Sequence, residues 1–347
     1  MAIPPAGKRV QEISAEAAEP PPRFFVKDNG FGGGVSSAQV ADIPVIDLNL
    51  LLGTDPDAKE AEFTRFKSAL NFWGCFQLIG HGMSNLFLEK VRGVGKEFFS
   101  LPMKEKEKYV RSTQSPEGYG NDSVLAENQI LDWCDRLFLK IYPQNQTDLH
   151  FWPQTPPDFS EIMHEYSRKM KGLVDELLKM MAKSLDIEED GLLNLIGDEP
   201  TLEARFNFYP KCPKADWILG VKAHADSSAF TILLQDKEVE GLQVLMDGKW
   251  YSVPVLPHAL VVNLGDQMQL MSNGMLKSLV HRAAVSSTQE RMSLAVFFTP
   301  DADKEIGPAE GLVNAERPRL YRSVKNYRVI NMKCFQSGEI PIDTLKI

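Results

Sequence analysis

Residues 230–264 read FTILLQDKEVEGLQVLMDGKWYSVPVLPHALVVNL, and no other part of the chain says more about its architecture. Short runs of β-branched and aromatic residues alternate there with Gly, Pro and Asp. Such closely spaced runs favour a sandwich or barrel of strands over alternating strands and helices. The same texture continues on both sides, so we expect at least these strands: Arg205–Tyr209, Phe230–Leu234, Leu242–Leu245, Trp250–Val253, Leu260–Leu264, Lys277–Arg282 and Met292–Thr299.

The residues before this β-rich part follow helical spacing instead. After a short predicted strand over 43–48, apolar residues recur at helical intervals over 60–73, which predicts an amphipathic helix. Ser84 can cap a second helix. Asp158 with Glu161 three positions on matches a capping box at the start of the longest helix. That helix is expected to pack against the core through Ile162, Tyr166, Met170, Leu173, Leu177, Met181 and Leu185.

Composition divides the chain into four regions. Residues 1–41 are rich in Pro, Gly and Ala, and their glycine run has no preceding strand, so we expect a flexible arm and not a dinucleotide site. An α-rich region over 42–198 follows, and the β-rich core over 199–335 comes after it. Residues 336–347 form a C-terminal tail.

The overall composition narrows the class of protein. The chain has 347 residues, of which 43% are hydrophobic and 24% charged, values typical of a soluble globular protein. The net charge is −9 and no basic stripe is present, which argues against a nucleic-acid partner. No apolar stretch is long enough to span a membrane. The four cysteines form no CxxC pair, which is typical of reduced thiols. We expect a cytoplasmic monomer.

A metal-binding pattern lies among the predicted strands. His224-Ala-Asp226 places an imidazole and a carboxylate two residues apart, and such positions point to the same side of an extended chain. A third ligand must come from a neighbouring strand, and His281 lies in one 55 residues after Asp226. Two histidines and one carboxylate leave positions open for O₂ and a cosubstrate, the geometry associated with non-haem Fe(II) oxygenases. We therefore expect these three residues to bind iron.

An anion-binding pair follows on the next predicted strand. Arg291 and Ser293 lie ten and twelve residues beyond His281, and strand alternation places them on one face. A guanidinium fork beside a hydroxyl is suited to binding a carboxylate. The sequence therefore predicts a carboxylate clamp close to the metal.

At this point the sequence resembles the plant 2-oxoglutarate- and Fe(II)-dependent dioxygenases, the family that includes anthocyanidin synthase. The likeness covers residues ~43–335. The matching pieces occur in the order found in the family: Ile43-Pro-Val-Ile-Asp47, Trp73-Gly-Cys-Phe-Gln-Leu-Ile-Gly-His-Gly82, Glu117-Gly-Tyr-Gly120, Leu131-Asp-Trp133, Asn207-Phe-Tyr-Pro210, His224-Ala-Asp226, Asn263-Leu-Gly-Asp266, Ser272-Asn-Gly274, His281-Arg282 and Arg291-Met-Ser293.

The resemblance implies a double-stranded β-helix, or jelly-roll of the cupin type, with an α-rich N-terminal region around it. It implies that Arg291 and Ser293 bind the distal carboxylate of 2-oxoglutarate, with Asn207 and Tyr209 beside this cosubstrate. Pocket positions in relatives match Phe138, Lys140, Arg205 and Phe297. The aromatic residues Tyr119, Trp133 and Phe298 are further candidates for a largely apolar substrate pocket.

The implied activity is hydroxylation or O-demethylation of a small specialised metabolite such as a flavonoid, alkaloid or phenylpropanoid. The reaction would be coupled to decarboxylation of 2-oxoglutarate to succinate and CO₂, with O₂ as oxidant and ascorbate as reductant. Lys140 and Arg205 are candidates for contacting a carboxylate or phenolate of the substrate. Two alternatives remain at this point: an ascorbate-dependent iron oxidase that does not use 2-oxoglutarate, and a non-catalytic binder of small molecules on the same scaffold.

Overall fold

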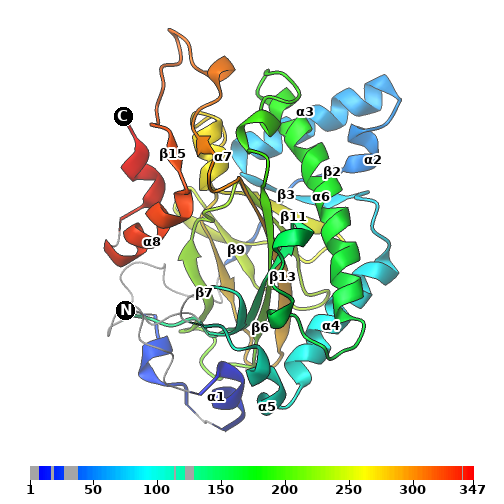
Figure 1. The fold of residues 1–347 in the computed structure, drawn as a ribbon, viewed down its shortest axis with the longest axis vertical. Helices are drawn as coiled ribbons and strands as arrows, with labels where there is room; N and C mark the ends of the chain where they lie inside the picture. Colours follow the sequence, from blue (N-terminus) through cyan, green and yellow to red (C-terminus); the bar gives the residue numbers. More distant parts are fainter. Residues whose placement is uncertain (1–7, 17–18, 27–37, 113–114, 122–128, 338) are drawn as a thin grey trace.

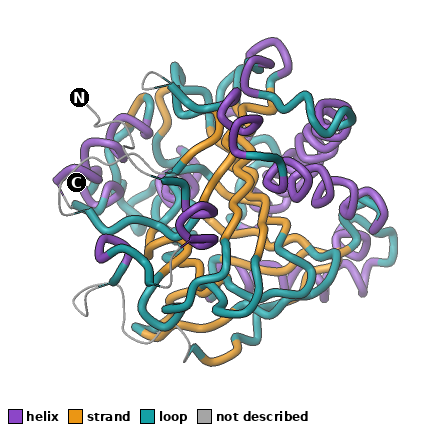
Figure 2. The backbone as a smooth tube through the Cα atoms, turned by 90° about the horizontal axis from the view of Figure 1, so that it is seen from below, coloured by secondary structure: helices purple, strands orange, loops and turns teal. Residues whose placement is uncertain are grey.

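The computed structural model describes residues 8–16, 19–26, 38–112, 115–121, 129–337 and 339–347. Its centre is a sandwich of two sheets, which confirms the predicted mainly-β jelly-roll with flanking helices (Figure 1). Viewed from below, the strands gather in the middle and the helices lie around them (Figure 2). The helices are α1 (Val10–Glu16), α2 (Leu48–Leu51), α3 (Pro56–Phe72), α4 (Asn85–Ser100), α5 (Met103–Lys106), α6 (Phe159–Ser184), α7 (Asp266–Met271) and α8 (Tyr327–Ser337).

The larger sheet has eight strands and draws them from both halves of the chain. Most neighbours run antiparallel, and β2 beside β3 is parallel. Strand β5 pairs directly with β6, so the larger sheet contains neighbouring strands from both sides of residue 199. The boundary between the α-rich region and the β-rich core at that residue stays a prediction. The strand order is β2 (Val45–Asp47), β3 (Cys75–Ile79), β11 (Leu260–Leu264), β8 (Phe230–Leu234), β13 (Arg291–Thr299), β6 (Thr201–Tyr209), β5 (Asp135–Tyr142) and β4 (Gly118–Gly120).

The smaller sheet faces the larger one and has five strands. Its edge strand β7 pairs antiparallel with β12, and a register irregularity interrupts that pairing. The strand order is β1 (Gln39–Val40), β10 (Lys249–Ser252), β9 (Leu242–Met246), β12 (His281–Ala284) and β7 (Leu219–His224). A separate pair, β14 (Glu305–Ile306) and β15 (Val324–Lys325), lies near α7 and α8.

Helices α3, α4 and α6 cover the outer face of the larger sheet, and one hydrophobic core joins them to it. All seven residues of the predicted stripe on α6 are buried, which confirms that part of the prediction. The predicted cap of α4 is also present, since the Ser84 hydroxyl accepts from the backbone N–H of Phe87 at 3.2 Å. The capping box at α6 is wrong. Asp158 has φ −90° and ψ 2°, and its side chain caps nothing that the structure describes, because a cap requires an extended backbone there.

The predicted strands are largely confirmed, and several strands were missed, of which β5 and β7 line or adjoin the site. Phe230–Leu234 and Leu260–Leu264 have their predicted bounds, whereas the strand expected from Lys277 begins only at His281. Strand β5 was missed although Leu137, Leu139 and Ile141 alternate along it and are buried. Strand β7 was missed because its glycine, lysine and histidine interrupt any apolar run.

Parts of the predicted flexible arm are packed against the body. Val10 is fully buried, and the ring of Phe24 contacts that of Trp133 edge-on at 5.0 Å between centroids. Strand β1 pairs with β10. Val10 and Phe24 pack through single apolar side chains, which the average composition of residues 1–41 does not reveal. The glycine run over 30–34 lies outside the described residues.

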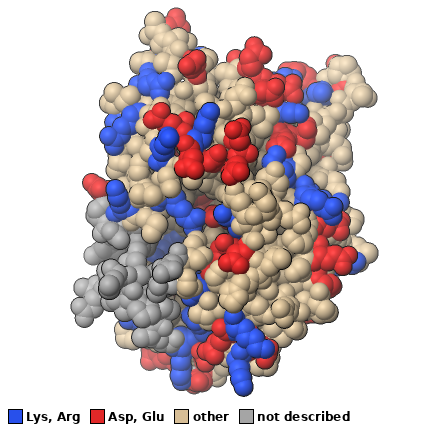
Figure 3. Space-filling view, viewed as in Figure 1, with Lys and Arg blue, Asp and Glu red and all other residues tan. Residues whose placement is uncertain are grey.

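Two further expectations concern the surface and the thiols. On the face shown in Figure 3, acidic and basic side chains are interspersed without a continuous basic stripe. None of the helices in the described ranges has both the length and the apolarity needed to cross a bilayer. The four cysteines are buried thiols without a disulfide, as their spacing predicted.

Candidate metal centre and cosubstrate site

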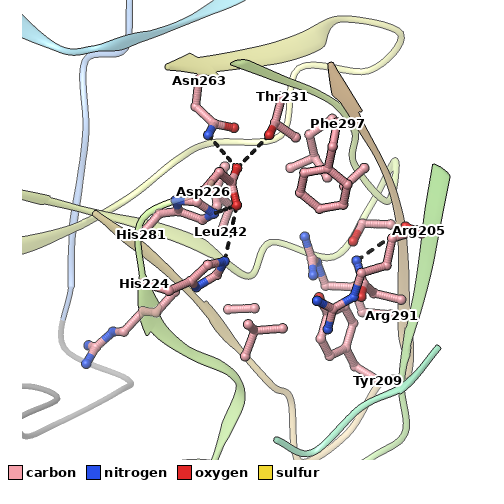
Figure 4. Close-up of a pocket in the computed structure, with 17 residues that line it drawn as sticks. Arg205, Tyr209, His224, Asp226, Thr231, Leu242, Asn263, His281, Arg291 and Phe297 are labelled. Carbon is pink, nitrogen blue, oxygen red and sulfur yellow. Dashed lines mark hydrogen bonds and ion pairs between the residues drawn. The ribbon is translucent and has the colours of Figure 1, made fainter. Parts of the chain in front are cut away.

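A pocket lies between the two sheets and brings most of the predicted site residues together. The smaller sheet lines it from β7, β9 and β12, and the larger sheet lines it from β6, β8, β11 and β13. His224, Asp226 and His281 lie on one side, and Arg205, Arg291 and Tyr209 lie on the opposite side (Figure 4). The pocket thus has a side with metal-ligating groups and a side with cationic groups.

The register of two neighbouring strands brings the two histidines together. His224 ends β7, His281 begins β12, and the two are direct partners in the ladder, with ring centroids 4.4 Å apart. Asp226 follows β7 and turns back toward both rings. Its Oδ1 lies 3.4 Å from Nε2 of His224 and 3.8 Å from Nε2 of His281. One ligand atom from each residue lies within 4.8 Å of the others, which suits a single ion.

Hydrogen bonds orient each ring so that Nε2 is available. Nδ1 of His224 lies 2.7 Å from the carbonyl oxygen of Lys222, and Nδ1 of His281 lies 3.1 Å from that of Leu279. A carbonyl can only accept, so Nδ1 carries a proton in both rings, and Nε2 is the atom that can bind a metal once it is deprotonated. This is the arrangement by which metal-binding histidines are held in one tautomer.

The carboxylate of Asp226 is oriented in the same way by the larger sheet. Its Oδ2 accepts from the Thr231 hydroxyl at 2.6 Å and from the Asn263 side-chain amide at 2.9 Å. Asp226 is buried, so these bonds replace the water that its charge loses. They leave Oδ1 directed at the histidines. No sequence pattern predicted these roles of Thr231 and Asn263, although Asn263 belongs to one of the matching pieces.

The electrostatics of the three groups favour an ionised carboxylate. Burial alone would raise the pKa of Asp226, but the charges of the histidines and the hydrogen bonds hold that pKa well below its usual range. Burial would also lower the pKa of His224, yet the hydrogen bond and charge of Asp226 raise it above the usual value. Burial lowers the pKa of His281. Two nitrogen donors and one anionic oxygen match the ligand set of a non-haem Fe(II) site.

Strand pairing brings together the residues of the predicted cosubstrate clamp. On β13, Arg291 and Ser293 are directly opposite Tyr209 and Asn207 of β6. Arg291 is buried, and its guanidinium carbon lies 5.0 Å from the centre of the Tyr209 ring. Its Nε donates to the carbonyl of Val239 at 3.2 Å, while its Nη1 has no hydrogen-bond partner among the described residues. A buried donor without a partner is costly, so this atom fits a site for an anion.

Tyr209 and Arg205 complete the cationic side of the pocket. Burial raises the pKa of Tyr209 to about 12, so its phenol keeps the proton and can donate it to an acceptor. Arg205 lies on the same face of β6 as Asn207 and Tyr209, two and four residues before them. The pocket therefore contains a second guanidinium besides that of Arg291.

The remaining predicted pocket residues divide into two groups. Phe297 lines the pocket, and Phe138 packs behind it with ring centroids 6.4 Å apart. Phe298 points to the opposite face of β13 and packs on Phe230 in the core, because neighbouring strand residues face opposite ways. Tyr119 is fully buried in the same core.

Two more predicted residues lie away from the pocket. Trp133 is fully buried under Phe24, and its Nε1 donates to the carbonyl of Pro210 at 3.1 Å. Lys140 also lies outside the pocket lining, with its ammonium 3.3 Å from the side-chain oxygen of Gln146. Composition alone could not separate these buried or outward-facing side chains from those that line the pocket.

Comparisons with known proteins agree with this geometry. The 2OG-Fe(II) oxygenase superfamily matches residues 201–300, and the non-haem dioxygenase N-terminal family named for morphine synthesis matches residues 43–156. Jasmonate-induced oxygenase 4 of Arabidopsis thaliana is 36% identical over 97% of this chain and 96% of its own length. Codeine O-demethylase of Papaver somniferum is 37% identical, over 90% of this chain and 88% of the relative.

Solved structures give the same result. The crystal structure of JOX2 in complex with 2OG, Fe and JA covers all of both chains with a TM-score of 0.89 and 32% identity. The dioxygenase for auxin oxidation from rice covers 88% of this chain and 100% of its own, with a TM-score of 0.73 and 27% identity. These matches favour a 2-oxoglutarate-dependent enzyme over the two alternatives, the ascorbate-dependent oxidase and the non-catalytic binder. The chain belongs to the 2OG-Fe(II) oxygenase superfamily and is a 2-oxoglutarate-dependent dioxygenase, an oxidoreductase that uses Fe(II), 2-oxoglutarate and O₂, with ascorbate as reductant.

Proposed function

We propose that His224, Asp226 and His281 bind the iron and that Arg291 and Ser293 bind the distal carboxylate of 2-oxoglutarate. The observation that carries this proposal is one pocket with three converging ligand atoms on one side and, on the other, Nη1 of Arg291, which has no hydrogen-bond partner in the described part of the chain. Bound Fe(II) supplies the site at which O₂ is activated for oxidation coupled to decarboxylation of 2-oxoglutarate.

The residues of this chain position the cosubstrate and protect the reaction. The fork of Arg291 and the hydroxyl of Ser293 hold one end of the keto acid, so that its other end faces the ligand triad. The protonated phenol of Tyr209 can donate to the same carboxylate. The two sheets bury Asp226, Arg291 and Ser293, which limits the access of water to a strong oxidant formed beside them.

The organic substrate is proposed to be a small specialised metabolite, such as a flavonoid, alkaloid or phenylpropanoid, that is hydroxylated or O-demethylated. Leu233, Leu242 and Phe297 give the pocket apolar walls that suit such a molecule. Arg205 supports a substrate with a carboxylate or phenolate, since its charge is additional to the one that binds 2-oxoglutarate. The named relatives include a codeine O-demethylase and a flavonol synthase/flavanone 3-hydroxylase, so the family accommodates different substrate classes.

A substrate screen tests this proposal. The purified protein with Fe(II), 2-oxoglutarate and ascorbate is incubated with metabolites of each class, and succinate above the uncoupled background is measured. Each acid is paired with its methyl ester. We expect turnover of an anionic member and a marked loss for its ester, and we expect Arg205→Gln to abolish that preference. Equal turnover of acids and esters would remove Arg205 from substrate binding.

Location in the cytoplasm, a monomeric state and the absence of a nucleic-acid partner stay predictions from the sequence. Gel filtration with light scattering measures the oligomeric state directly. The substrate itself is a small molecule, as expected of an oxygenase of this family.

A further inference from the structure

The strand that carries His224 lies at an exposed position in its sheet. In the five-stranded sheet, β7 is the last strand, and β12 is its one strand partner among the described residues. The pairing of these two strands is also irregular between His281 and Ala284. An edge strand has one row of backbone groups without a strand partner. Something other than the sheet must therefore hold the end of β7 at the metal site.

The segment 131–133, from the α-rich part of the chain, covers this free edge. The backbone N–H of Trp133 donates to the carbonyl of Leu219 at 2.9 Å, at the start of β7. Near the other end, the backbone N–H of Lys222 donates to Oδ1 of Asp132 at 3.0 Å. The Lys222 ammonium lies 2.5 Å from the same oxygen. The Asp132 carboxylate, which is buried, thus takes the place of a strand partner.

The residue that Asp132 holds is the one that orients His224. The carbonyl of Lys222 accepts from Nδ1 of His224 at 2.7 Å. Asp132 binds the N–H and the ammonium of Lys222, and the carbonyl of Lys222 sets the tautomer and the direction of the ring. His281 is held differently, because its acceptor Leu279 is tied into the body by a backbone bond to Leu264 at 3.1 Å.

We propose that Asp132 is a positioning residue for the metal ligand His224, acting through Lys222. This inference rests on the proposed role of His224 as a ligand. Asp132 touches neither metal nor substrate, and its role is to hold the end of an edge strand in register with β12. Outer partners of metal-bound histidines typically change metal affinity by about 10–100-fold when they are removed.

Removing the carboxylate should leave the segment itself in place. Trp133 is anchored independently, since its indole nitrogen donates to the carbonyl of Pro210 at 3.1 Å and its ring packs against Phe24. The backbone N–H of Leu131 donates to the carbonyl of Arg23 at 3.0 Å. A change at Asp132 therefore acts on Lys222 and His224 more than on the fold.

The test measures metal binding by the full-length metal-free protein. Fe(II) affinity is determined by anaerobic calorimetry, and the visible absorption of bound Co(II) reports the ligand geometry. The variants are Asp132→Ala, the isosteric Asp132→Asn and the conservative Lys222→Arg. The matched control is Asp175→Asn, which removes a similar contact with Lys171, at 2.7 Å, on the remote helix α6.

We expect Asp132→Ala to weaken Fe(II) binding by about tenfold or more and to alter the Co(II) spectrum. Asp132→Asn should have a smaller effect in the same direction, because its oxygen still accepts from the Lys222 N–H. Lys222→Arg should weaken binding less than Asp132→Ala, because it keeps the backbone N–H and a cation beside Asp132. Asp175→Asn should bind as the wild type does. If Asp132→Ala does not fold, Asp132→Asn decides the matter.

The inference is overturned if folded Asp132→Asn and Asp132→Ala bind Fe(II) within twofold of the wild type with an unchanged Co(II) spectrum. A loss of melting temperature without a loss of affinity would also overturn it, because that is the result of a purely structural role. A failure of the underlying site assignment has a different signature, namely a His224→Ala variant that binds Fe(II) as tightly as the wild type.

Discussion

The two sheets contribute to the pocket in different ways. The larger sheet supplies the predicted clamp from the regular pairing of β13 with β6, in which Arg291 and Ser293 face Tyr209 and Asn207 in one continuous register. The smaller sheet supplies the histidines from strand ends, at an irregular pairing that includes its edge strand. Asp226 joins the two, because it follows a strand of the smaller sheet and is hydrogen-bonded by Thr231 and Asn263 of the larger one.

This difference shows how each half of the site obtains its rigidity. The clamp residues are held by the unbroken ladder between β13 and β6, and the ladder between β13 and β8 begins at the next residue, Leu294, so the clamp geometry follows from the fold. The metal ligands depend on individual polar contacts, which are the carbonyls of Lys222 and Leu279 and the donors to Asp226. We therefore expect a single substitution beside the metal ligands to disturb more of the site than a single substitution beside the clamp.

The largest effect is expected at the ligands themselves. His224→Ala or Asp226→Ala should abolish turnover and weaken iron binding while the protein remains folded, because each removes one of three converging ligand atoms. Turnover is measured as succinate formation and iron binding by calorimetry. The matched control is His150→Ala, at an exposed histidine. Activity like that of the wild type in either ligand variant would contradict the assignment.

The next effect concerns the clamp. Arg291→Ala should raise the KM for 2-oxoglutarate by roughly 10–100-fold, since a hydrogen bond to a charged group contributes about 1.5–3 kcal/mol. Iron affinity in the absence of 2-oxoglutarate should not change, because Arg291 belongs to the other sheet. An unchanged requirement for 2-oxoglutarate would remove Arg291 from the clamp.

A smaller effect is expected from the residues that orient Asp226. Thr231→Val keeps the shape of the side chain but removes its 2.6 Å hydrogen bond to Oδ2. Iron affinity should fall by about tenfold, because the carboxylate loses one of two donors. The control Thr288→Val removes a hydroxyl from an exposed turn. If Thr231→Val binds iron like the control, the larger sheet does not position the carboxylate.

The smallest effect is the dependence of iron binding on pH. The pKa of His224 is raised by Asp226, so this ring is protonated at a higher pH than an ordinary histidine and competes with the metal there. Iron affinity should fall as the pH drops through the histidine range, by at most about tenfold per pH unit for this proton. Calorimetry at several pH values measures the slope. An affinity independent of pH from 8 to 6 would contradict the role of His224.

As the pH falls through the histidine range, iron affinity should decrease, whereas the contribution of His224 to the stability of the metal-free protein should increase. A histidine whose pKa is raised in the folded state contributes stability below its unfolded pKa, and this contribution is lost as the pH rises through the folded pKa. Urea unfolding of the metal-free wild type and of His224→Ala should therefore differ most at low pH. Metal affinity and metal-free stability then move in opposite directions along the same titration.

The sequence predicted local patterns well and three-dimensional neighbours less well. Alternation along one strand placed Arg291 and Ser293 on one face, and the same rule places Phe298 in the core beside Phe297 in the pocket. The roles considered for Tyr119, Trp133 and Lys140 came from residue type or from positions in relatives. The structure places all three away from the pocket, because the packing around a side chain decides where it points.

By itself, the sequence determined the class of fold and predicted the ligand triad and the clamp, since these depend on residue types at short spacings and on strand alternation. Only the tertiary structure decided how β7 and β12 pair to bring His224 beside His281, and which groups orient them. It also decided that Thr231 and Asn263 hold Asp226 and that Asp132 covers the edge of β7. The physical reason is that a hydrogen bond acts over a few ångströms in space between residues that can be 90 positions apart in the chain.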